Sequence, residues 1–246
     1  MEHWYDRTET LLGQDAVSRL ASSRVLVAGV GGVGGYAAEM LARTGVGHIT
    51  MIDADNVAVS NINRQLIALH GTVDESKVEL FAQRFRDINP EIETKTLQQY
   101  ITAENVPELL GDGYDYVIDA IDTVAPKMAL IIHCLTHKIP IISSMGAGGR
   151  IDPTRVGYFD ISETREDGLA RVVRQRLRKE GIRHGLEVVA STEAPRRRSV
   201  IELNEPNKRS SFGTIASIPA IFGIFLANKV IIKLAALNNN KQHVGN

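Results

Sequence analysis

The side chains best suited to chemistry follow one another along a short stretch of chain after residue 52. They are two carboxylates, two amides and two cations: Asp53, Asp55, Asn61, Arg64, Gln65 and Lys77. Each one taken alone is typical of a solvated surface or a helix cap. Taken together, cations near a helix N-terminus suit a triphosphate, whose charge must be bound and then relieved as a phosphoryl-bearing group leaves. The cluster therefore indicates phosphate chemistry on a nucleotide.

A glycine-rich turn precedes this cluster and predicts where the nucleotide lies. Residues 24–28 form an apolar, β-branched run that predicts a buried strand, and residues 36–42 predict a helix. The turn between them satisfies G-x-G-x-x-G, with glycines at Gly29, Gly31, Gly32 and Gly34. Such a turn directs unpaired backbone N–H groups and the positive helix end at a phosphate. A second strand over 48–53 ends at Asp53, where a Rossmann-type fold offers a carboxylate to ribose hydroxyls.

The glycine turn alone does not identify the nucleotide, because the same unit binds NAD, FAD, S-adenosylmethionine and ATP. A P-loop is excluded, since no G-x-x-x-x-G-K-[ST] sequence occurs. A further strand over 116–122 ends at Asp122, and a carboxylate at the carboxyl edge of such a sheet can hold Mg²⁺ beside phosphates. A dehydrogenase needs neither Arg64 nor Lys77. We therefore predict ATP with Mg²⁺ and keep an NAD-dependent oxidoreductase as one alternative.

The order of these motifs resembles the adenylation domain of the ubiquitin-activating-enzyme superfamily, which includes the thiamine and molybdopterin adenylyltransferases. The matching elements are G-x-G-G-x-G, Asp53-x-Asp55, Asn61-x-x-Arg64-Gln65, Lys77 and Asp119-x-x-Asp122. Enzymes of this superfamily use ATP to adenylate a carboxylate and release pyrophosphate. The resemblance implies that Asp53 binds ribose and that Asp122 holds Mg²⁺. It implies that Asn61, Arg64 and Lys77 bind phosphates, and that Arg7 reaches the γ-phosphate in the partner subunit of a homodimer.

A basic region in the second half of the chain points to a polyanionic partner. The formal net charge of the chain is −1, but residues 165–198 carry ten basic side chains and five acidic ones. In the helix predicted over 169–179, the apolar stripe is Leu169, Val173 and Leu177, and we expect the opposite face to carry Arg171, Arg174 and Arg178. Arg196, Arg197 and Arg198 follow. Such a helix is ordinarily a solvated, salt-bridged face, but few acids lie on it, so we expect these arginines to bind phosphates.

Two features common in enzymes that adenylate ubiquitin-like carriers are missing from the sequence. There are no CxxC pairs for zinc, and no cysteine after the nucleotide half that could take part in sulfur or thioester chemistry. The single cysteine, Cys134, lies in an apolar stretch that predicts a buried helix, so we expect it to pack and not to react. His133 and His137 lie one helical turn apart beside it, without an evident third metal ligand.

The chain therefore resembles one branch of the superfamily, the tRNA threonylcarbamoyladenosine dehydratases, in segments 149–155, 172–178 and 188–193. In that branch ATP activates the carboxylate of a threonine already attached to an adenosine of the tRNA anticodon loop. The carbamoyl group on the base attacks that carboxylate, and a ring closes with net loss of water. No enzyme nucleophile is required, because the attacking group sits on the same nucleotide. Some members carry cysteines in the C-terminal region, and this chain carries none there.

A second alternative is an adenylyltransferase that activates the C-terminal carboxylate of a ubiquitin-like sulfur-carrier protein. It predicts a partner with a Gly-Gly tail and little need for the arginine face. The sequence does not decide whether the protein has a sulfurtransferase or sulfur-acceptor partner, or whether it binds a monovalent cation.

Length and composition fit one domain of ordinary globular type. The 246 residues are 43% hydrophobic and 23% charged, which excludes a disordered, collagen-like or coiled-coil chain. We predict a single α/β Rossmann-like adenylation domain over 1–237, with a mainly parallel sheet flanked by helices. Its parts are a nucleotide half (1–144), a substrate-side segment (145–211) and a C-terminal apolar helix (212–237), before a polar tail (238–246).

The C-terminal apolar segment raises the question of a membrane. Glycines and a proline interrupt it and lysines follow, so we expect it to pack on the nucleotide domain or on a dimer partner, and integral membrane insertion is not expected. One cysteine and a polar, acidic N-terminus predict a cytoplasmic protein.

Overall fold

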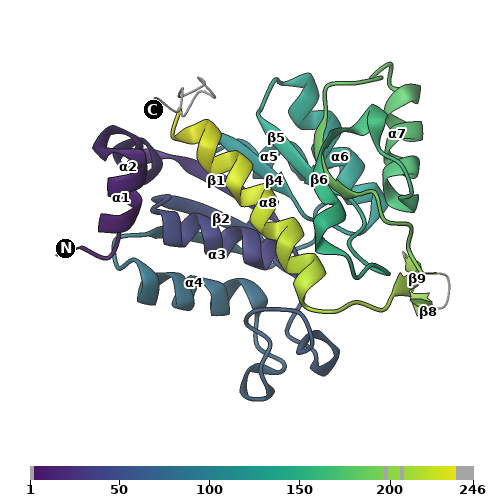
Figure 1. The fold of residues 1–246 in the computed structure, drawn as a ribbon, viewed down its shortest axis with the longest axis horizontal. Helices are drawn as coiled ribbons and strands as arrows, with labels where there is room; N and C mark the ends of the chain where they lie inside the picture. The colour runs from purple at the N-terminus through teal and green to yellow at the C-terminus, as the bar shows by residue number, and fades with distance from the viewer. Residues whose placement is uncertain (1–2, 197–198, 206–207, 237–246) are drawn as a thin grey trace, which may run out of the picture.

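The structure is a computed structural model that describes residues 3–196, 199–205 and 208–236. Its centre is a seven-stranded sheet in the order β3-β2-β1-β4-β5-β7-β6 (Figure 1). The strands are β1 (Arg24–Ala28), β2 (His48–Ile52), β3 (Glu93–Leu97), β4 (Tyr116–Asp119), β5 (Ile141–Ser144), β6 (Val156–Asp160) and β7 (Glu187–Ser191). Neighbouring strands are parallel except β6 with β7. The predicted fold class is confirmed.

Helices cover both faces of this sheet. They are α1 (Asp6–Leu12), α2 (Gln14–Ser22), α3 (Gly34–Thr44), α4 (Lys77–Ile88), α5 (Val106–Leu109), α6 (Val124–Thr136), α7 (Gly168–Lys179) and α8 (Ser217–Leu234). Short 3-10 turns lie at Val59–Asn61, His70–Thr72, Pro153–Arg155 and Ile161–Glu163. A separate hairpin pairs β8 (Val200–Glu205) with β9 (Lys208–Phe212).

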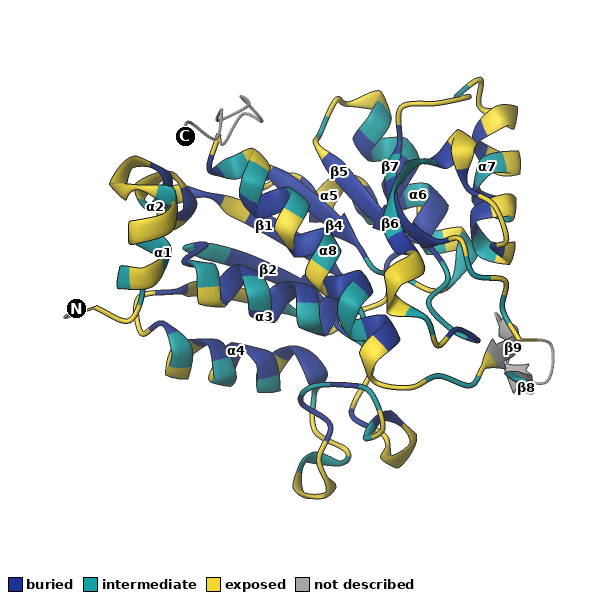
Figure 2. Ribbon diagram, in the orientation of Figure 1, coloured by how far each residue is buried: buried dark blue, intermediate teal, exposed yellow. Residues whose placement is uncertain are grey.

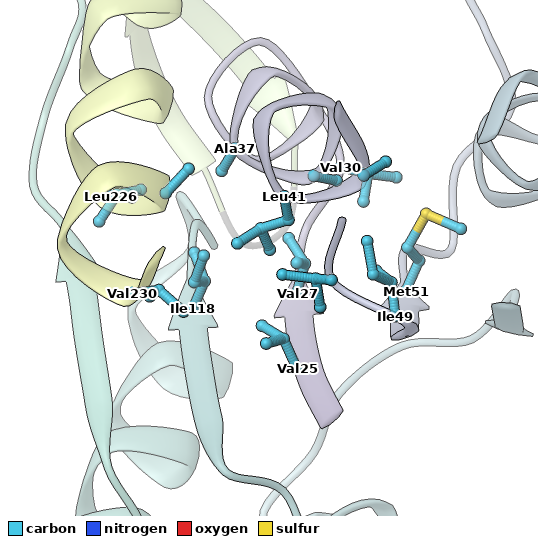
Figure 3. Packing of buried hydrophobic residues seen from close by; sticks show 14 of the residues in the cluster. Val25, Val27, Val30, Ala37, Leu41, Ile49, Met51, Ile118, Leu226 and Val230 are labelled. Carbon is cyan, nitrogen blue, oxygen red and sulfur yellow. The ribbon is translucent and has the colours of Figure 1, made fainter. Parts of the chain in front are cut away.

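The inner strands contribute to two hydrophobic cores, because successive side chains point to opposite faces of a sheet. Val25 and Val27 of β1 join a core with α2, α3, α4 and α8, part of which Figure 3 shows. Leu26 and Ala28 join a second core with α5, α6 and α7. The inner strands are buried on both sides, as expected of a parallel sheet covered by helices, whereas the edge strands β3 and β6 are partly exposed (Figure 2).

The strand order creates a crevice beside β1. The chain runs outward from β1 through β2 to β3, and then returns to place β4 on the other side of β1. In open α/β sheets ligands bind at such a reversal, outside the carboxyl ends of the strands. The glycine turn follows β1 directly, so it lies at this position.

The C-terminal helix α8 packs against α3 on one face of the sheet (Figure 1). A Cβ on Gly223 would lie 2.2 Å from the Val33 carbonyl oxygen, so only glycine permits this approach. The helix begins at Ser217, later than the predicted 212, because residues 208–212 form β9 instead. By length and composition α8 could also cross a membrane, with a mean hydropathy of 1.6. The predicted tail, 238–246, lies outside the described residues.

Candidate active site

The four glycines of the turn serve two different purposes. Gly29 has φ +84°, and a Cβ on Gly34 would lie 1.8 Å from the Gly29 carbonyl oxygen, so the backbone itself requires both. The other two face the predicted cluster. A Cβ on Gly31 would lie 3.5 Å from the Gln65 side-chain nitrogen, and one on Gly32 would lie 3.3 Å from Cγ of Arg64. Gly31 therefore lies against Gln65 and Gly32 against Arg64, which places the turn beside these polar side chains.

Helix α3 begins in this turn, where the Gly35 amide donates to the Gly31 carbonyl at 3.0 Å. Its N-cap is Val33, which makes no side-chain cap hydrogen bond. The first amides of a helix have no partner within the helix, and they carry the positive end of its dipole. The sequence predicts an anion site at a helix N-terminus in this turn, and the structure places the start of α3 there.

The carboxylate of Asp53 is fixed by two backbone amides. Its Oδ2 accepts a hydrogen bond from the Val30 amide at 2.8 Å, and its Oδ1 accepts one from the Asp55 amide at 3.0 Å. Lys77 is buried and lies 2.8 Å from Oδ2 of Asp55 and 3.9 Å from Oδ1 of Asp53. Burial raises the pKa of Asp53, while the Lys77 charge and the two amides oppose that shift. The predicted Asp53, Asp55 and Lys77 therefore form one connected group.

The loop after β2 carries the remaining predicted residues and brings Arg64 and Gln65 to the turn. Asn61 is buried and its Oδ1 accepts a hydrogen bond from the Ala58 amide at 3.1 Å. Arg64 is half-buried and donates to the Ser60 carbonyl and to Oδ1 of Asn63, each at 2.8 Å. Gln65 is 8% exposed, yet its Oε1 has no hydrogen-bond partner. A buried acceptor without a partner is costly, so this amide is poised for a ligand donor.

Asp122 follows β4 at the carboxyl edge of the sheet. Next to it lies a buried ion pair that the sequence analysis did not predict. Lys127 and Asp119 are both wholly buried, with 2.6 Å between Nζ and Oδ2. The Ser143 hydroxyl donates to the same oxygen at 2.5 Å, and Nζ also donates to the Ile121 carbonyl at 2.9 Å. The pair thus holds the backbone immediately before Asp122. A lone lysine in the otherwise apolar stretch 124–136 was the available signal for it.

A second buried group connects the three segments that resemble the dehydratase branch. Arg150 donates to the Glu193 carbonyl at 3.0 Å and to Oδ2 of Asp167 at 3.1 Å. Asp167 caps α7 through the Ala170 amide and also accepts from the Gly146 amide at 2.9 Å. The turn after β5, the start of α7 and the end of β7 therefore form one substrate-side unit.

The arginines of α7 divide into two kinds. Arg171 and Arg178 are exposed, as predicted. Arg174 is half-buried, and its guanidinium donates to the Ile161 and Thr164 carbonyls and to the Thr164 hydroxyl. Arg174 therefore differs from Arg171 and Arg178, because its side chain is bonded to the segment before α7. The predicted phosphate contacts of the three arginines stay a prediction. Arg196 is exposed, and Arg197 and Arg198 lie outside the described residues.

Arg7 is not brought to the nucleotide cluster of its own chain. It is exposed on α1. The nearby Trp4 approaches Gly45, which follows the last residue of α3, whereas the glycine turn lies at the first (Figure 1). Any contact of Arg7 with a nucleotide would have to be made to another subunit.

The structure buries the single cysteine. Cys134 is inaccessible to solvent, and burial, assisted by the Asp119 charge, raises its thiol pKa to about 12. The His133 and His137 rings stack with centroids 4.0 Å apart. Among the described residues no group of three His, Cys, Asp or Glu side chains could hold a metal ion.

The parallel sheet, the glycine turn and the clustered cations define a nucleotide-binding α/β domain. Comparison with known families narrows this class: the chain belongs to the ThiF family, whose model matches residues 5–245. It is 49% identical to the tRNA threonylcarbamoyladenosine dehydratase of Bacillus subtilis, over 79% of this chain and 77% of that protein. It is 40% identical to the enzyme of the same name from Escherichia coli, over 93% and 92% of the two chains.

A solved structure of similar fold is also known. The crystal structure of the Escherichia coli tRNA N6-threonylcarbamoyladenosine dehydratase in complex with ATP matches with a TM-score of 0.85. The match has 40% identity and covers 95% of this chain and 94% of that one. A similar match is found with the AMP complex of the same enzyme.

Proposed function

We propose that the chain is an ATP-dependent tRNA threonylcarbamoyladenosine dehydratase. The observation that carries this proposal is the similarity to enzymes of that name along nearly the whole chain, including the substrate-side unit built on Arg150. A nucleotide half alone would serve many activities, because one fold supports several chemistries. The substrate-side unit is the part that distinguishes them.

The residues present fit ATP at the glycine turn. The turn carries no side chain at Gly31 and Gly32, the positive end of the α3 dipole lies there, and Gln65 offers a buried acceptor without a partner. In the proposed site Asp53 binds the ribose hydroxyls, with Asp55 holding Lys77 beside it. Asn61, Arg64 and Lys77 bind the phosphates. The charge of Arg64 and Lys77 stabilises the negative charge that develops on the departing pyrophosphate.

Asp122 is the residue that would hold Mg²⁺. The ion usually takes one or two protein carboxylates and completes its coordination with phosphate oxygens and water, so a three-ligand protein site is not needed. When bound, it would neutralise phosphate charge during the transfer. The buried Lys127–Asp119 pair fixes the turn that presents Asp122.

The reaction proceeds in two steps that balance. A carboxylate oxygen of the threonyl group attacks the α-phosphorus of ATP, and pyrophosphate leaves. The carbamoyl group of the same nucleotide then attacks the acyl carbon, AMP leaves with the former carboxylate oxygen, and the carbamoyl group loses a proton. The sum is the loss of one water. The protein supplies binding and orientation, which can account for about 7–11 kcal/mol of a barrier in favourable cases.

Exposed arginines of α7, together with Arg196, would bind the tRNA backbone. Arg171, Arg178 and Arg196 are exposed. In the sequence Arg197 and Arg198 directly follow Arg196. Arginine is well suited to phosphate, because its planar guanidinium can donate two parallel hydrogen bonds. A tRNA substrate also agrees with the predicted cytoplasmic location.

A homodimer would complete the nucleotide site. An open hollow of about 730 Å³ lies between α4 and the loop before it, and its lining includes Trp4, Leu66, Leu69 and Leu80. Trp4 and Leu69 are 45% and 60% exposed, which is unusual for such large apolar side chains beside a hollow. A second copy covering this hollow would bring its own α1, and with it Arg7, to its neighbour.

The decisive experiment uses purified protein, ATP, Mg²⁺ and tRNA that carries threonylcarbamoyladenosine. Digestion and mass spectrometry of the nucleosides should show the loss of one water, dependent on ATP, together with AMP and pyrophosphate. Unchanged nucleoside with efficient adenylation of a Gly-Gly-tailed carrier protein would instead favour the adenylyltransferase alternative. This chain is 34% identical to the Escherichia coli sulfur carrier protein ThiS adenylyltransferase over 56% of this chain, which is why a carrier protein is the alternative substrate in the experiment.

A further inference from the structure

Residues 212–214 physically join the two halves of the site. The Gly213 carbonyl accepts a hydrogen bond from the Gly149 amide at 2.9 Å, which attaches this segment to the substrate-side turn. The next residue attaches it to the phosphate cluster: the Asn63 side-chain nitrogen donates to the Thr214 carbonyl at 3.2 Å. Asn63 in turn accepts from Arg64. A substrate whose carboxylate meets the nucleotide must therefore pass close to this segment.

Phe212 stands at the start of this segment with an accessible aromatic ring. It is 38% exposed, although a phenylalanine ordinarily buries its ring. Two glycines make room for it: a Cβ on Gly148 would lie 2.7 Å from Cβ of Phe212, and one on Gly149 would lie 3.1 Å from its Cδ1. The ring is thus supported on one side by the substrate-side turn and is open to solvent on another.

The backbone of Arg196 is attached to the same turn. The Arg196 amide donates to the Gly149 carbonyl at 2.9 Å, and the Arg196 side chain is exposed. Segment 165–198 carries five more basic than acidic side chains. An exposed aromatic ring and an exposed arginine attached to the same turn are a combination suited to single-stranded nucleic acid, which proteins bind through base stacking and phosphate contacts.

We propose that Phe212 stacks on an unpaired base of the RNA substrate next to the reacting adenosine, with Arg196 binding an adjacent phosphate. This inference rests on the proposed dehydratase function and names a binding contact for it. Bases of an anticodon loop are unpaired and can be splayed onto aromatic side chains. Phe212 would position the RNA, so it should affect RNA binding and leave ATP binding unchanged.

The test compares Phe212→Leu with Phe212→Tyr and with a control, Tyr100→Leu. Leucine retains apolar packing on the two glycines and removes the aromatic face, whereas tyrosine keeps both. Tyr100 is an exposed aromatic residue that follows β3, at the opposite edge of the sheet.

The probe is an anticodon stem-loop RNA that carries threonylcarbamoyladenosine. We expect Phe212→Leu to raise its Kd and KM by about tenfold to a hundredfold, with kcat and the ATP Kd within about twofold. Phe212→Tyr and Tyr100→Leu should resemble the wild type.

A fluorescence measurement covers the case in which Phe212→Leu fails to fold. Phe212→Trp places an indole where stacking is proposed, and the RNA should quench its emission far more than that of the wild type, whose single tryptophan is Trp4. Water loss by the wild-type enzyme with an unchanged RNA Kd and KM in Phe212→Leu would overturn the stacking contact alone. Equal quenching in Phe212→Trp and the wild type would overturn it too. Absence of water loss in the wild type would overturn the proposed function itself.

Discussion

The Arg150 guanidinium and the Asp167 carboxylate form an ion pair, with 3.1 Å between Nη2 and Oδ2, and both side chains are almost wholly buried. The same arginine donates to carbonyl oxygens of the turn after β5 and to that of Glu193, while the same aspartate caps α7. One pair therefore joins three segments that are far apart in the sequence. The substrate-side unit depends on this pair, because the pair and its hydrogen bonds connect the turn after β5, the start of α7 and the end of β7.

We predict that Arg150→Met lowers the free energy of unfolding by about 3–5 kcal/mol, because it leaves the Asp167 charge buried without its partner. Denaturant unfolding followed by circular dichroism measures this change. The matched control is Arg155→Met, which breaks an exposed ion pair with Asp152 at 3.4 Å and should cost at most about 1 kcal/mol. Equal losses in the two variants would show that burial does not increase the contribution of the Arg150–Asp167 pair to the free energy of unfolding.

We predict that Asp122→Asn lowers kcat by about a hundredfold or more, since the neutral amide is a poor ligand for the ion that neutralises phosphate charge. Excess Mg²⁺ should restore little of the loss. Release of pyrophosphate measures the first step, and the melting temperature verifies the fold. Asp112→Asn is the control, because Asp112 is an exposed carboxylate paired with Lys95 away from the cluster. Turnover near that of the wild type in Asp122→Asn would mean that another group holds the ion.

The nucleotide half was predictable because its chemistry is local in the sequence. The strand, the glycine turn and the helix are consecutive, and the acid after β2 follows from the period of the βαβ unit. The family resemblance then supplied roles for Asn61, Arg64 and Lys77. The structure places Arg64 beside Gly32 and pairs Lys77 with Asp55. The predicted oxidoreductase alternative needed none of this cation cluster.

The substrate half was less predictable because its contacts are long-range. Helical periodicity places Arg174 with Arg171 and Arg178, but a face is solvated only where no other segment covers it. Residues 161–164 cover Arg174 and bond its guanidinium. The partnership of Lys127 with Asp119 and that of Arg150 with Asp167 likewise depend on which turns the sheet brings together. Periodicity carries no information about such pairs.

This division of the arginines leads to a prediction about tRNA binding. Replacing Arg171 and Arg178 together by glutamine should weaken tRNA binding by about tenfold or more at low salt, and should reduce the log–log salt slope by about 0.7–0.9 for each lost phosphate contact. ATP affinity should not change. Filter binding across a salt series measures both quantities. Identical slopes in the double variant and the wild type would exclude this face from the RNA interface.

Arg174→Gln is the informative comparison for that double variant. It removes hydrogen bonds to the Thr164 and Ile161 carbonyls, so it should lower the melting temperature while leaving the salt slope close to that of the wild type. A change in slope without a change in melting temperature would show instead that Arg174 leaves its intramolecular contacts to bind RNA.

We predict that Cys134→Ala keeps turnover within about threefold and lowers stability by about 1–2 kcal/mol, because it removes a small buried side chain. The raised thiol pKa, about 12, leaves almost no thiolate at neutral pH. Iodoacetamide should therefore modify the unfolded chain and not the native one, which mass spectrometry can follow. An adduct on Cys134 during turnover would contradict direct cyclisation.

The pH dependence of Asp53 should have opposite signs for stability and for ligand binding. Burial raises its pKa in the folded protein above the ordinary value, so the folded state holds this proton more tightly than the unfolded chain does. The stability that Asp53 contributes is therefore greatest below the ordinary pKa and is lost as the pH rises through the raised one. Ribose binding needs the ionised carboxylate as an acceptor, so affinity should instead fall as the pH is lowered through the same range.

Adenosine is the suitable probe for this pH dependence because it has no phosphate to titrate, and calorimetry from about pH 7 to about pH 4 covers the range. Asp53→Asn should weaken binding at neutral pH and make it nearly independent of pH. An unchanged pH profile in that variant would assign the ribose contact to another residue.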